Sequence, residues 1–71
     1  MWLVIKDEMI NLNYIESINY VVCSEGGQFE LDFYKNNKIV SYLFFNNENE
    51  IKNAFLNIKM ALKNGKKFLE L

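Results

Sequence analysis

The sequence predicts an α+β fold in which five short antiparallel strands form an open sheet or half-barrel, packed by one C-terminal helix at about residues 47–63. Residues 29–34 alternate between apolar and polar side chains, which is typical of a strand with one buried face. Four apolar residues in the helical segment repeat at helical spacing and form one stripe, made of Ile51, Phe55, Ile58 and Leu62. A chain of 71 residues fits a single domain over residues 1–71.

The first three predicted strands precede a glycine pair. Residues 2–5 and 9–12 are rich in β-forming side chains and flank a polar turn, so we expect a small hairpin. Asn13 can adopt the left-handed conformation and is expected to mark a bend. Residues 14–23 form the third strand, because their second half is β-branched and aromatic. We expect a bulge near Glu16–Ser17, which would bring the flanking isoleucines to one side.

Two further strands complete the predicted sheet. The paired glycines within residues 24–28 permit positive φ and indicate a hairpin turn. The strand at 29–34 points three apolar side chains to the core, namely Phe29, Leu31 and Phe33. A polar turn at 35–38 precedes the strand at 39–45, which is apolar or aromatic on both faces. Such a strand is expected to be covered on both sides. One side faces the helix, and the other could face a second subunit.

The predicted helix has a start signal and a stop signal. Asn47 is the expected N-cap, and Glu50 three residues later completes an Asn variant of the capping box. Asn64-Gly65 ends the helix, because both residues tolerate the conformation that follows a C-cap. Two outcomes stay open for the tail at 66–71, which forms either a short edge strand or a frayed end.

The residue types argue against catalysis. His and Arg are absent, so the usual general base near neutral pH and the bidentate clamp for phosphate are both missing. Cys23 is the only cysteine, which excludes an internal disulfide and a cysteine-based zinc site. We therefore predict a protein that is not an enzyme, has no cofactor or metal, and occupies the reducing cytoplasm.

A pair of carboxylates offers the one alternative to this view. Glu30 and Asp32 share a strand face and, with Glu16 on a neighbouring strand, could bind a divalent cation through oxygen ligands. The alternation of the strand favours a different interpretation, in which these carboxylates form an ordinary solvated sheet face.

Composition limits the class and the source of the protein. No apolar run approaches the roughly 20 residues of a membrane helix. The N-terminus lacks the basic lead and the long apolar centre of a signal peptide, so none is expected. Eleven Asn and eight Lys, with many Ile, are typical of a low-GC bacterial genome or of a mobile element such as a phage.

The aromatic content predicts an interface. One Trp, four Tyr and six Phe exceed what a sheet with a single helix can bury, because such a fold has only one protected face. Aromatic side chains are enriched at protein interfaces. We therefore predict a non-catalytic protein-interaction or accessory module, expected to associate with itself as a homodimer or to bind a protein partner. The candidate interface residues are Trp2, Tyr20, Tyr34, Tyr42 and Phe44.

A cluster of lysines supports a second hypothesis. The candidate anion-binding residues lie around the end of the predicted helix and are Lys59, Lys63, Lys66 and Lys67. Together with exposed tyrosines they would suit single-stranded nucleic acid or another anionic ligand. The net charge of −1 and the lack of Arg weigh against nucleic acid, and the helix dipole accounts for cations at this end.

Two resemblances complete the sequence analysis. The order of strands and helix resembles the C-terminal half of a pleckstrin-homology-like barrel capped by its helix. The run Ile10-Asn11-Leu12-Asn13-Tyr14-Ile15-Glu16-Ser17-Ile18, followed by two strands and a helix that begins with Glu48 and Glu50, is similar to the small bacterial flagellar-operon protein family. This similarity covers roughly residues 9–58 in outline. It implies a regulatory or accessory role, without catalytic residues to carry over.

Overall fold

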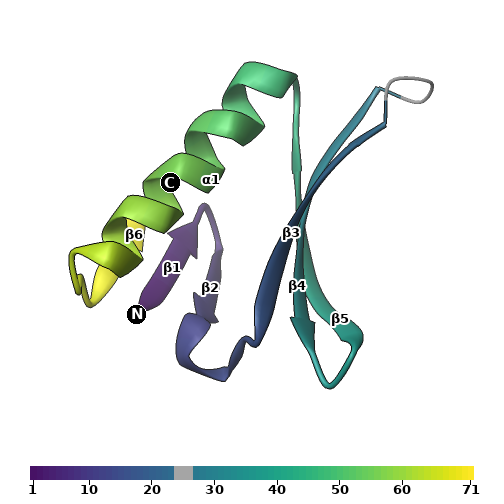
Figure 1. Ribbon diagram of the computed structural model, residues 1–71. Helices are drawn as coiled ribbons and strands as arrows, with labels where there is room; N and C mark the ends of the chain where they lie inside the picture. The colour runs from purple at the N-terminus through teal and green to yellow at the C-terminus, as the bar shows by residue number, and fades with distance from the viewer. Residues whose placement is uncertain (24–26) are drawn as a thin grey trace.

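The computed structural model describes residues 1–23 and 27–71 (Figure 1). The described residues form six strands, one 3-10 turn and one α-helix, in the order β1 (Trp2–Ile5), β2 (Glu8–Asn11), η1 (Leu12–Tyr14), β3 (Ser17–Cys23), β4 (Gln28–Lys35), β5 (Lys38–Phe45), α1 (Glu48–Lys63) and β6 (Phe68–Glu70). The predicted α+β class and the C-terminal helix are confirmed. A sixth strand appears because the tail at 66–71 forms β6 instead of fraying.

The strands divide into two open sheets rather than one. The first sheet has the order β2-β1-β6, with β1 antiparallel to β2 and parallel to β6. The second sheet has the order β3-β4-β5 and is antiparallel throughout. Asn36 and Asn37 connect β4 to β5 with φ values of 54° and 62°. Asparagine tolerates this left-handed conformation, which a two-residue hairpin turn of type I′ requires.

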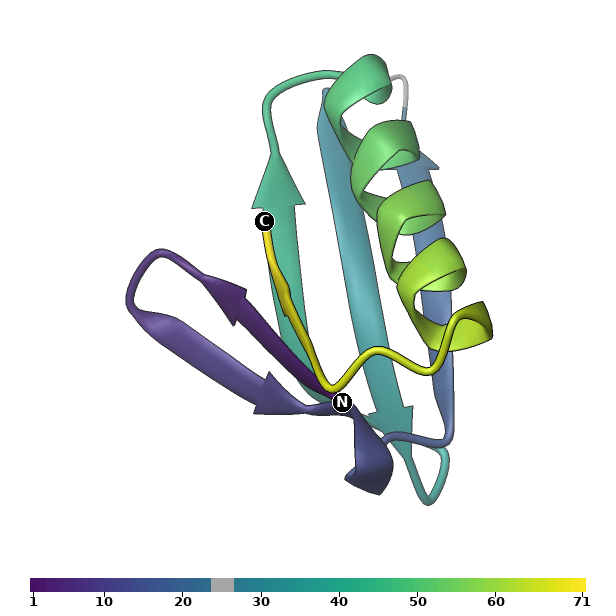
Figure 2. The same ribbon diagram turned by 90° about the vertical axis from the view of Figure 1, so that its left-hand side faces the viewer.

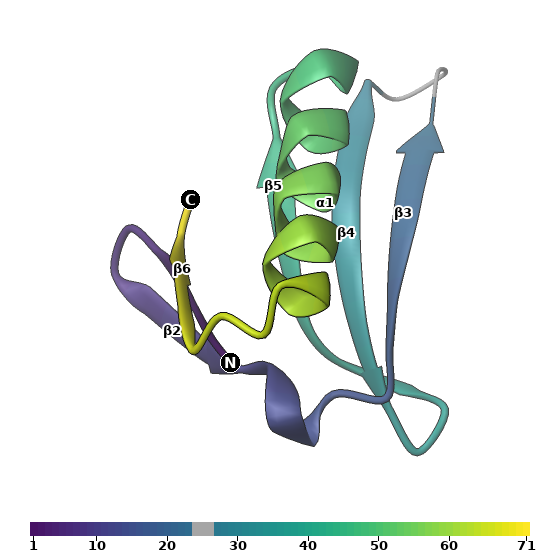
Figure 3. The same cartoon turned by 60° about the vertical axis from the view of Figure 1, so that its left-hand side comes forward.

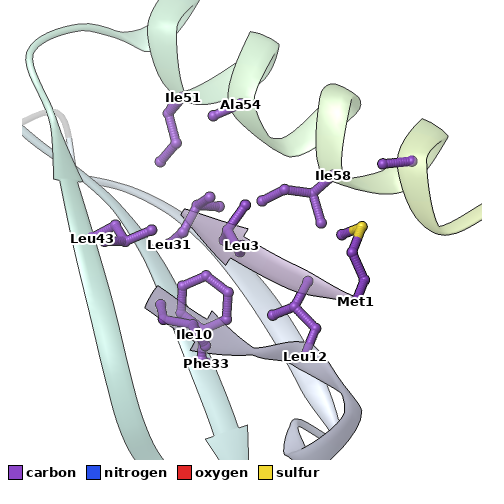
Figure 4. Close-up of a cluster of buried hydrophobic side chains, with 11 residues drawn as sticks. Met1, Leu3, Ile10, Leu12, Leu31, Phe33, Leu43, Ile51, Ala54 and Ile58 are labelled. Carbon is purple, nitrogen blue, oxygen red and sulfur yellow. The ribbon is translucent and has the colours of Figure 1, made fainter. Parts of the chain in front are cut away.

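One face of the β3-β4-β5 sheet, which we call the inner face, is covered by the rest of the fold. α1 lies along this face, and the β2-β1-β6 sheet lies beside the helix (Figures 2 and 3). The largest fully buried side chains come from β1, β4 and α1 and meet between these layers (Figure 4); they are Leu3, Leu31, Phe33, Ile51 and Ile58. No described element covers the opposite face, which we call the outer face.

The predicted cap of α1 is confirmed. The Asn47 side chain accepts a hydrogen bond from the Glu50 N–H at 2.9 Å. The Glu50 carboxylate accepts in return from the Asn46 N–H at 3.1 Å, one residue earlier than in the usual capping box. The buried stripe of the helix consists of Ile51, Ala54, Ile58 and Ala61. Leu62, predicted to belong to it, is exposed, because the face of the helix that meets the core runs through Ala54 and Ala61 and leaves Leu62 outside it.

The segment before β3 differs most from the prediction. Residues 12–14 form the turn η1, and the third strand begins at Ser17 instead of Tyr14. β2 ends at Asn11, one residue earlier than predicted, and the chain turns there into η1. Leu12 is buried, and its N–H donates to the Met1 carbonyl at 2.8 Å. Asn13 does not adopt positive φ; its N–H donates to the Asn11 side chain at 3.1 Å.

The continuous register of β3 and β4 runs from Ser17 to Cys23 and so begins at the predicted bulge. The Glu16 N–H donates to the carbonyl of Tyr34, the residue that Ser17 also faces, at 2.9 Å, and Ile15 and Ile18 both pack against the core, as the predicted bulge requires. A register shift occurs between β4 and β5 at Phe33/Tyr34, where Val40 is the extra residue. Residues 24–26 of the turn predicted at 24–28 lie outside the described residues, while β3 and β4, which flank it, are antiparallel as expected for a hairpin.

Candidate protein-interaction surface

Alternation along three strands builds the outer face. On β4, Leu31 and Phe33 are buried in the core, so the alternating residues Asp32 and Tyr34 point away from it. The pairing register places Asp32 between Asn19 on β3 and Tyr42 on β5. The next row places Glu30 between two apolar residues, Val21 on β3 and Phe44 on β5. The outer face therefore has carboxylates along its central strand and apolar or aromatic side chains beside them.

The aromatic part of the outer face is exposed. Tyr42 has 54% of its surface accessible and Phe44 has 62%. Their rings meet edge to face, with centroids 5.2 Å apart and an interplanar angle of 67°. Val21 and Val40 are also exposed. A folded chain gains nothing from leaving this much apolar surface in water, so the patch is a candidate binding surface.

Asp32 is buried although it lies on the outer face. Only 4% of its surface is accessible, and no described residue donates a hydrogen bond to its Oδ1 atom. A buried acceptor without a partner costs about 1–3 kcal/mol. The sequence interpretation of Asp32 as a solvated side chain is therefore wrong. A sequence signal did exist, because an Asp in the middle of a central strand is unusual and calls for a reason.

Glu30 responds to its neighbour. A hydrogen bond with Asp32, desolvation and the negative charge of Asp32 raise the pKa of Glu30 above its ordinary value of 4.5. Glu16, the third candidate oxygen ligand, lies before β3 and accepts a hydrogen bond from the Asn36 N–H at 3.1 Å, so it is held at the β4–β5 turn. Within residues 1–23 and 27–71 no group of three or more His, Cys, Asp or Glu could hold a metal ion.

The structure brings together three of the five predicted interface residues. Tyr34, Tyr42 and Phe44 lie on the outer face. Tyr20 lies on the inner face and packs edge-on against Phe55, with ring centroids 5.7 Å apart.

The remaining predicted interface residue, Trp2, belongs to the other sheet. Trp2 lies opposite Phe68 in the parallel register of β1 and β6, and both side chains are exposed. Sequence reasoning could not separate these surfaces, because it did not divide the strands into two sheets.

The lysines predicted to bind anions gather around one end of α1. Lys59 and Lys63 lie one turn apart on the helix, and Lys66 and Lys67 follow its end. All four are exposed. In the described residues an ion pair joins Lys52 to Glu48 at 3.1 Å, near the start of the helix. It does not involve the four lysines at the other end. Cations at a helix C-terminus are stabilised by the dipole, so their position needs no ligand.

The described residues form hollows beside the β3-β4-β5 sheet. A groove of about 630 Å³ separates the β1–β2 hairpin from β5, and its lining includes Tyr42 and Phe44 together with Asp7, Glu8 and Glu50. A smaller, apolar groove of about 290 Å³ lies between α1 and the start of β3.

As for membranes, none of the helical segments in the described ranges combines the length and the apolar character that crossing a bilayer requires.

Comparisons of the chain with protein-family models, with curated proteins and with solved structures found no match.

Proposed function

We propose that this chain is a non-catalytic protein-interaction module that binds a protein partner through the outer face of the β3-β4-β5 sheet. One observation carries the proposal: the Tyr42–Phe44 pair is exposed on a sheet face that no described element covers. Aromatic side chains of this kind supply much of the binding energy at protein interfaces, because they bury a large area with few rotatable bonds.

Several features support a protein partner over other ligands. Glu30 and Asp32, at the centre of the outer face, line none of the grooves found among the described residues, so this centre suits a macromolecule better than an enclosed small substrate. The lack of His and Arg in the sequence favours a role without catalysis. The resemblance to flagellar-operon proteins implies an accessory role of the same kind. A single cysteine fits a cytoplasmic location.

A second copy of the chain is the alternative occupant. Two copies meeting face to face would bring the Glu30 and Asp32 carboxylates of each copy towards those of the other, which like-charge repulsion opposes at neutral pH. A different protein is therefore the occupant that we propose, and self-association is an outcome that the experiment distinguishes.

A selection from a random peptide library displayed on phage tests the proposal without knowledge of the host. Peptides selected on the wild-type chain are expected to bind the double variant Tyr42→Ser, Phe44→Ser at least about tenfold more weakly, because the aromatic anchors are gone. Leu56→Ser is the matched control, since Leu56 is equally exposed but lies on α1. This variant should bind within about twofold of wild type.

Circular dichroism and light scattering complete the experiment. Helix content must be unchanged in the double variant, since a loss of folding would instead make these side chains part of the core. Peptides that bind the double variant as tightly as wild type, or a library that yields no binder, would contradict the proposal. A molar mass that rises with concentration in wild type but not in Phe44→Ser would identify a second copy as the occupant.

A further inference from the structure

We infer that the partner inserts a lysine or arginine side chain into the centre of the outer face, where Glu30 and Asp32 supply the counter-charge and Tyr42 and Phe44 flank the cation. This inference rests on the proposed function and adds the chemistry of the partner: one basic residue set among apolar ones.

The position of the carboxylates is the first argument. Glu30 and Asp32 lie on β4, the central strand of the sheet, in two successive rows of the outer face. Tyr42 and Phe44 occupy the same two rows on β5. The residues that dominate binding lie near the centre of an interface and are ringed by side chains that exclude water. A charge at this centre calls for an opposite charge in the partner.

The unpartnered oxygen of Asp32 is the second argument. Asp32 is more than nine-tenths buried, and its Oδ1 receives no hydrogen bond from the described residues. The lysines nearest in sequence lie at the β4–β5 turn, where Lys35 Nζ is held 5.2 Å from the centroid of the Tyr14 ring. A donor from outside the chain would satisfy the oxygen, and a charged donor forms the strongest such bond.

The surroundings select an organic cation over a metal ion. Calcium takes about six to eight oxygen ligands, whereas this surface offers two carboxylates among apolar neighbours. Aromatic rings attract ammonium and guanidinium groups through the negative charge of their faces. No lysine occupies an outward position of β4 or β5 in the described part of the chain, so these two strands place no cation beside the carboxylates.

Matched peptides test this inference. The tightest peptide from the selection is synthesised with its basic residue intact and with citrulline or norleucine in that place, and each is titrated calorimetrically. We expect the neutral replacement to weaken binding to wild type about tenfold or more, because a charge-assisted hydrogen bond is lost. Against Asp32→Asn the two peptides should differ by less than about twofold, since the counter-charge is reduced. Glu30→Gln serves as the second variant if Asp32→Asn does not fold.

The outcomes separate this inference from the proposed function. Selected peptides that depend on Tyr42 and Phe44 but carry no basic residue, or that tolerate its replacement, would overturn the basic anchor and leave the interaction surface intact. Self-association of wild type that is lost in Phe44→Ser would also overturn it, because the occupant would be a second copy with the same carboxylates. Failure to obtain peptides that depend on Tyr42 and Phe44 would overturn the proposed function itself.

Discussion

At the scale of single residues, the carboxylates of β4 are the least expected feature of the molecule. Asp32 is nearly inaccessible and Glu30 beside it has a raised pKa. The hydrogen bond with Asp32 is the main cause of the raised pKa of Glu30, and desolvation and the negative charge of Asp32 add to it. A buried carboxyl group and a neighbour with a raised pKa therefore lie together in the centre of the face that we propose for binding.

The raised pKa of Glu30 predicts how the stability of the folded chain depends on pH. In the unfolded chain Glu30 titrates near its ordinary pKa of 4.5, whereas its pKa in the folded chain is higher. Between the two values the folded chain binds more protons, so the free energy of unfolding falls as pH rises. The contribution of Glu30 is fully present below 4.5 and is lost as pH passes the folded value. Glu30→Gln should remove this fall, since the neutral amide can donate to Asp32 at every pH.

Urea denaturation of both chains between about pH 4 and pH 7 measures this effect, because the window spans the ordinary titration range of glutamate and that just above it. Asp7→Asn on the β1–β2 turn is the control, and it should keep the wild-type decline. An equal decline in Glu30→Gln would show that Glu30 is not its source.

The burial of Asp32 marks what residue patterns leave undetermined. Alternation along residues 29–34 correctly assigned Leu31 and Phe33 to the core and Asp32 to the opposite face. It could not indicate that Asp32 would be buried there, because burial depends on residues of other strands, and the register places Asn19 and Tyr42 beside Asp32. The pairing register determines these neighbours. The register shifts at Val40 on β5, and nothing in the residues of β4 indicates this shift.

At the scale of elements, α1 is the part of the fold that sequence predicts best. Its start depends on local hydrogen bonds within four residues, from Asn47 to the Glu50 N–H and from Glu50 back to the Asn46 N–H. Signals of this kind depend only on residues close together in the sequence, so they can be recognised without the rest of the fold.

The cap gives a prediction for the helix. Asn47→Ala removes the acceptor for the Glu50 N–H and should lower the free energy of unfolding by about 1 kcal/mol. Asn49→Ala, two residues further on in the exposed first turn, is the control and should change it by less than about 0.5 kcal/mol. Thermal and urea unfolding followed by circular dichroism measure both. Equal effects of the two substitutions would rule out a specific role of the Asn47 side chain.

The division of the strands into two sheets shows the opposite case. β6 pairs in parallel with β1, from Trp2 against Phe68 to Val4 against Glu70. Further bonds run from the Trp2 N–H to the Lys67 carbonyl and from the Leu71 N–H to the Val4 carbonyl, each at 2.9 Å. The two segments are at opposite ends of the sequence, so no local pattern relates them. Either outcome for residues 66–71, strand or frayed end, was therefore consistent with the sequence.

At the scale of the whole molecule, the apolar side chains serve two purposes. Those on the inner face meet α1 and the β2-β1-β6 sheet and form the core, whereas those on the outer face are left without cover. The sequence predicted both sides of β5 to be apolar, and the structure places the helix layer on only one of them. Because the folded chain does not bury the outer side chains, they contribute little to its own stability, and a partner would supply their cover.

Leu43 and Phe44 test this separation most directly, because they are adjacent on β5 and point to opposite faces. Leu43 is 7% exposed and Phe44 is 62% exposed. Leu43→Ala should lower the free energy of unfolding by about 2–5 kcal/mol through the lost contacts and the cavity left behind. Phe44→Ala removes a larger side chain, yet it should change the free energy of unfolding by only about 0.5 kcal/mol, since its ring is already in water. Urea denaturation at equal protein concentration measures both. If Phe44→Ala destabilises the chain as much as Leu43→Ala, the ring belongs to the core, and the outer face has no surplus to offer a partner.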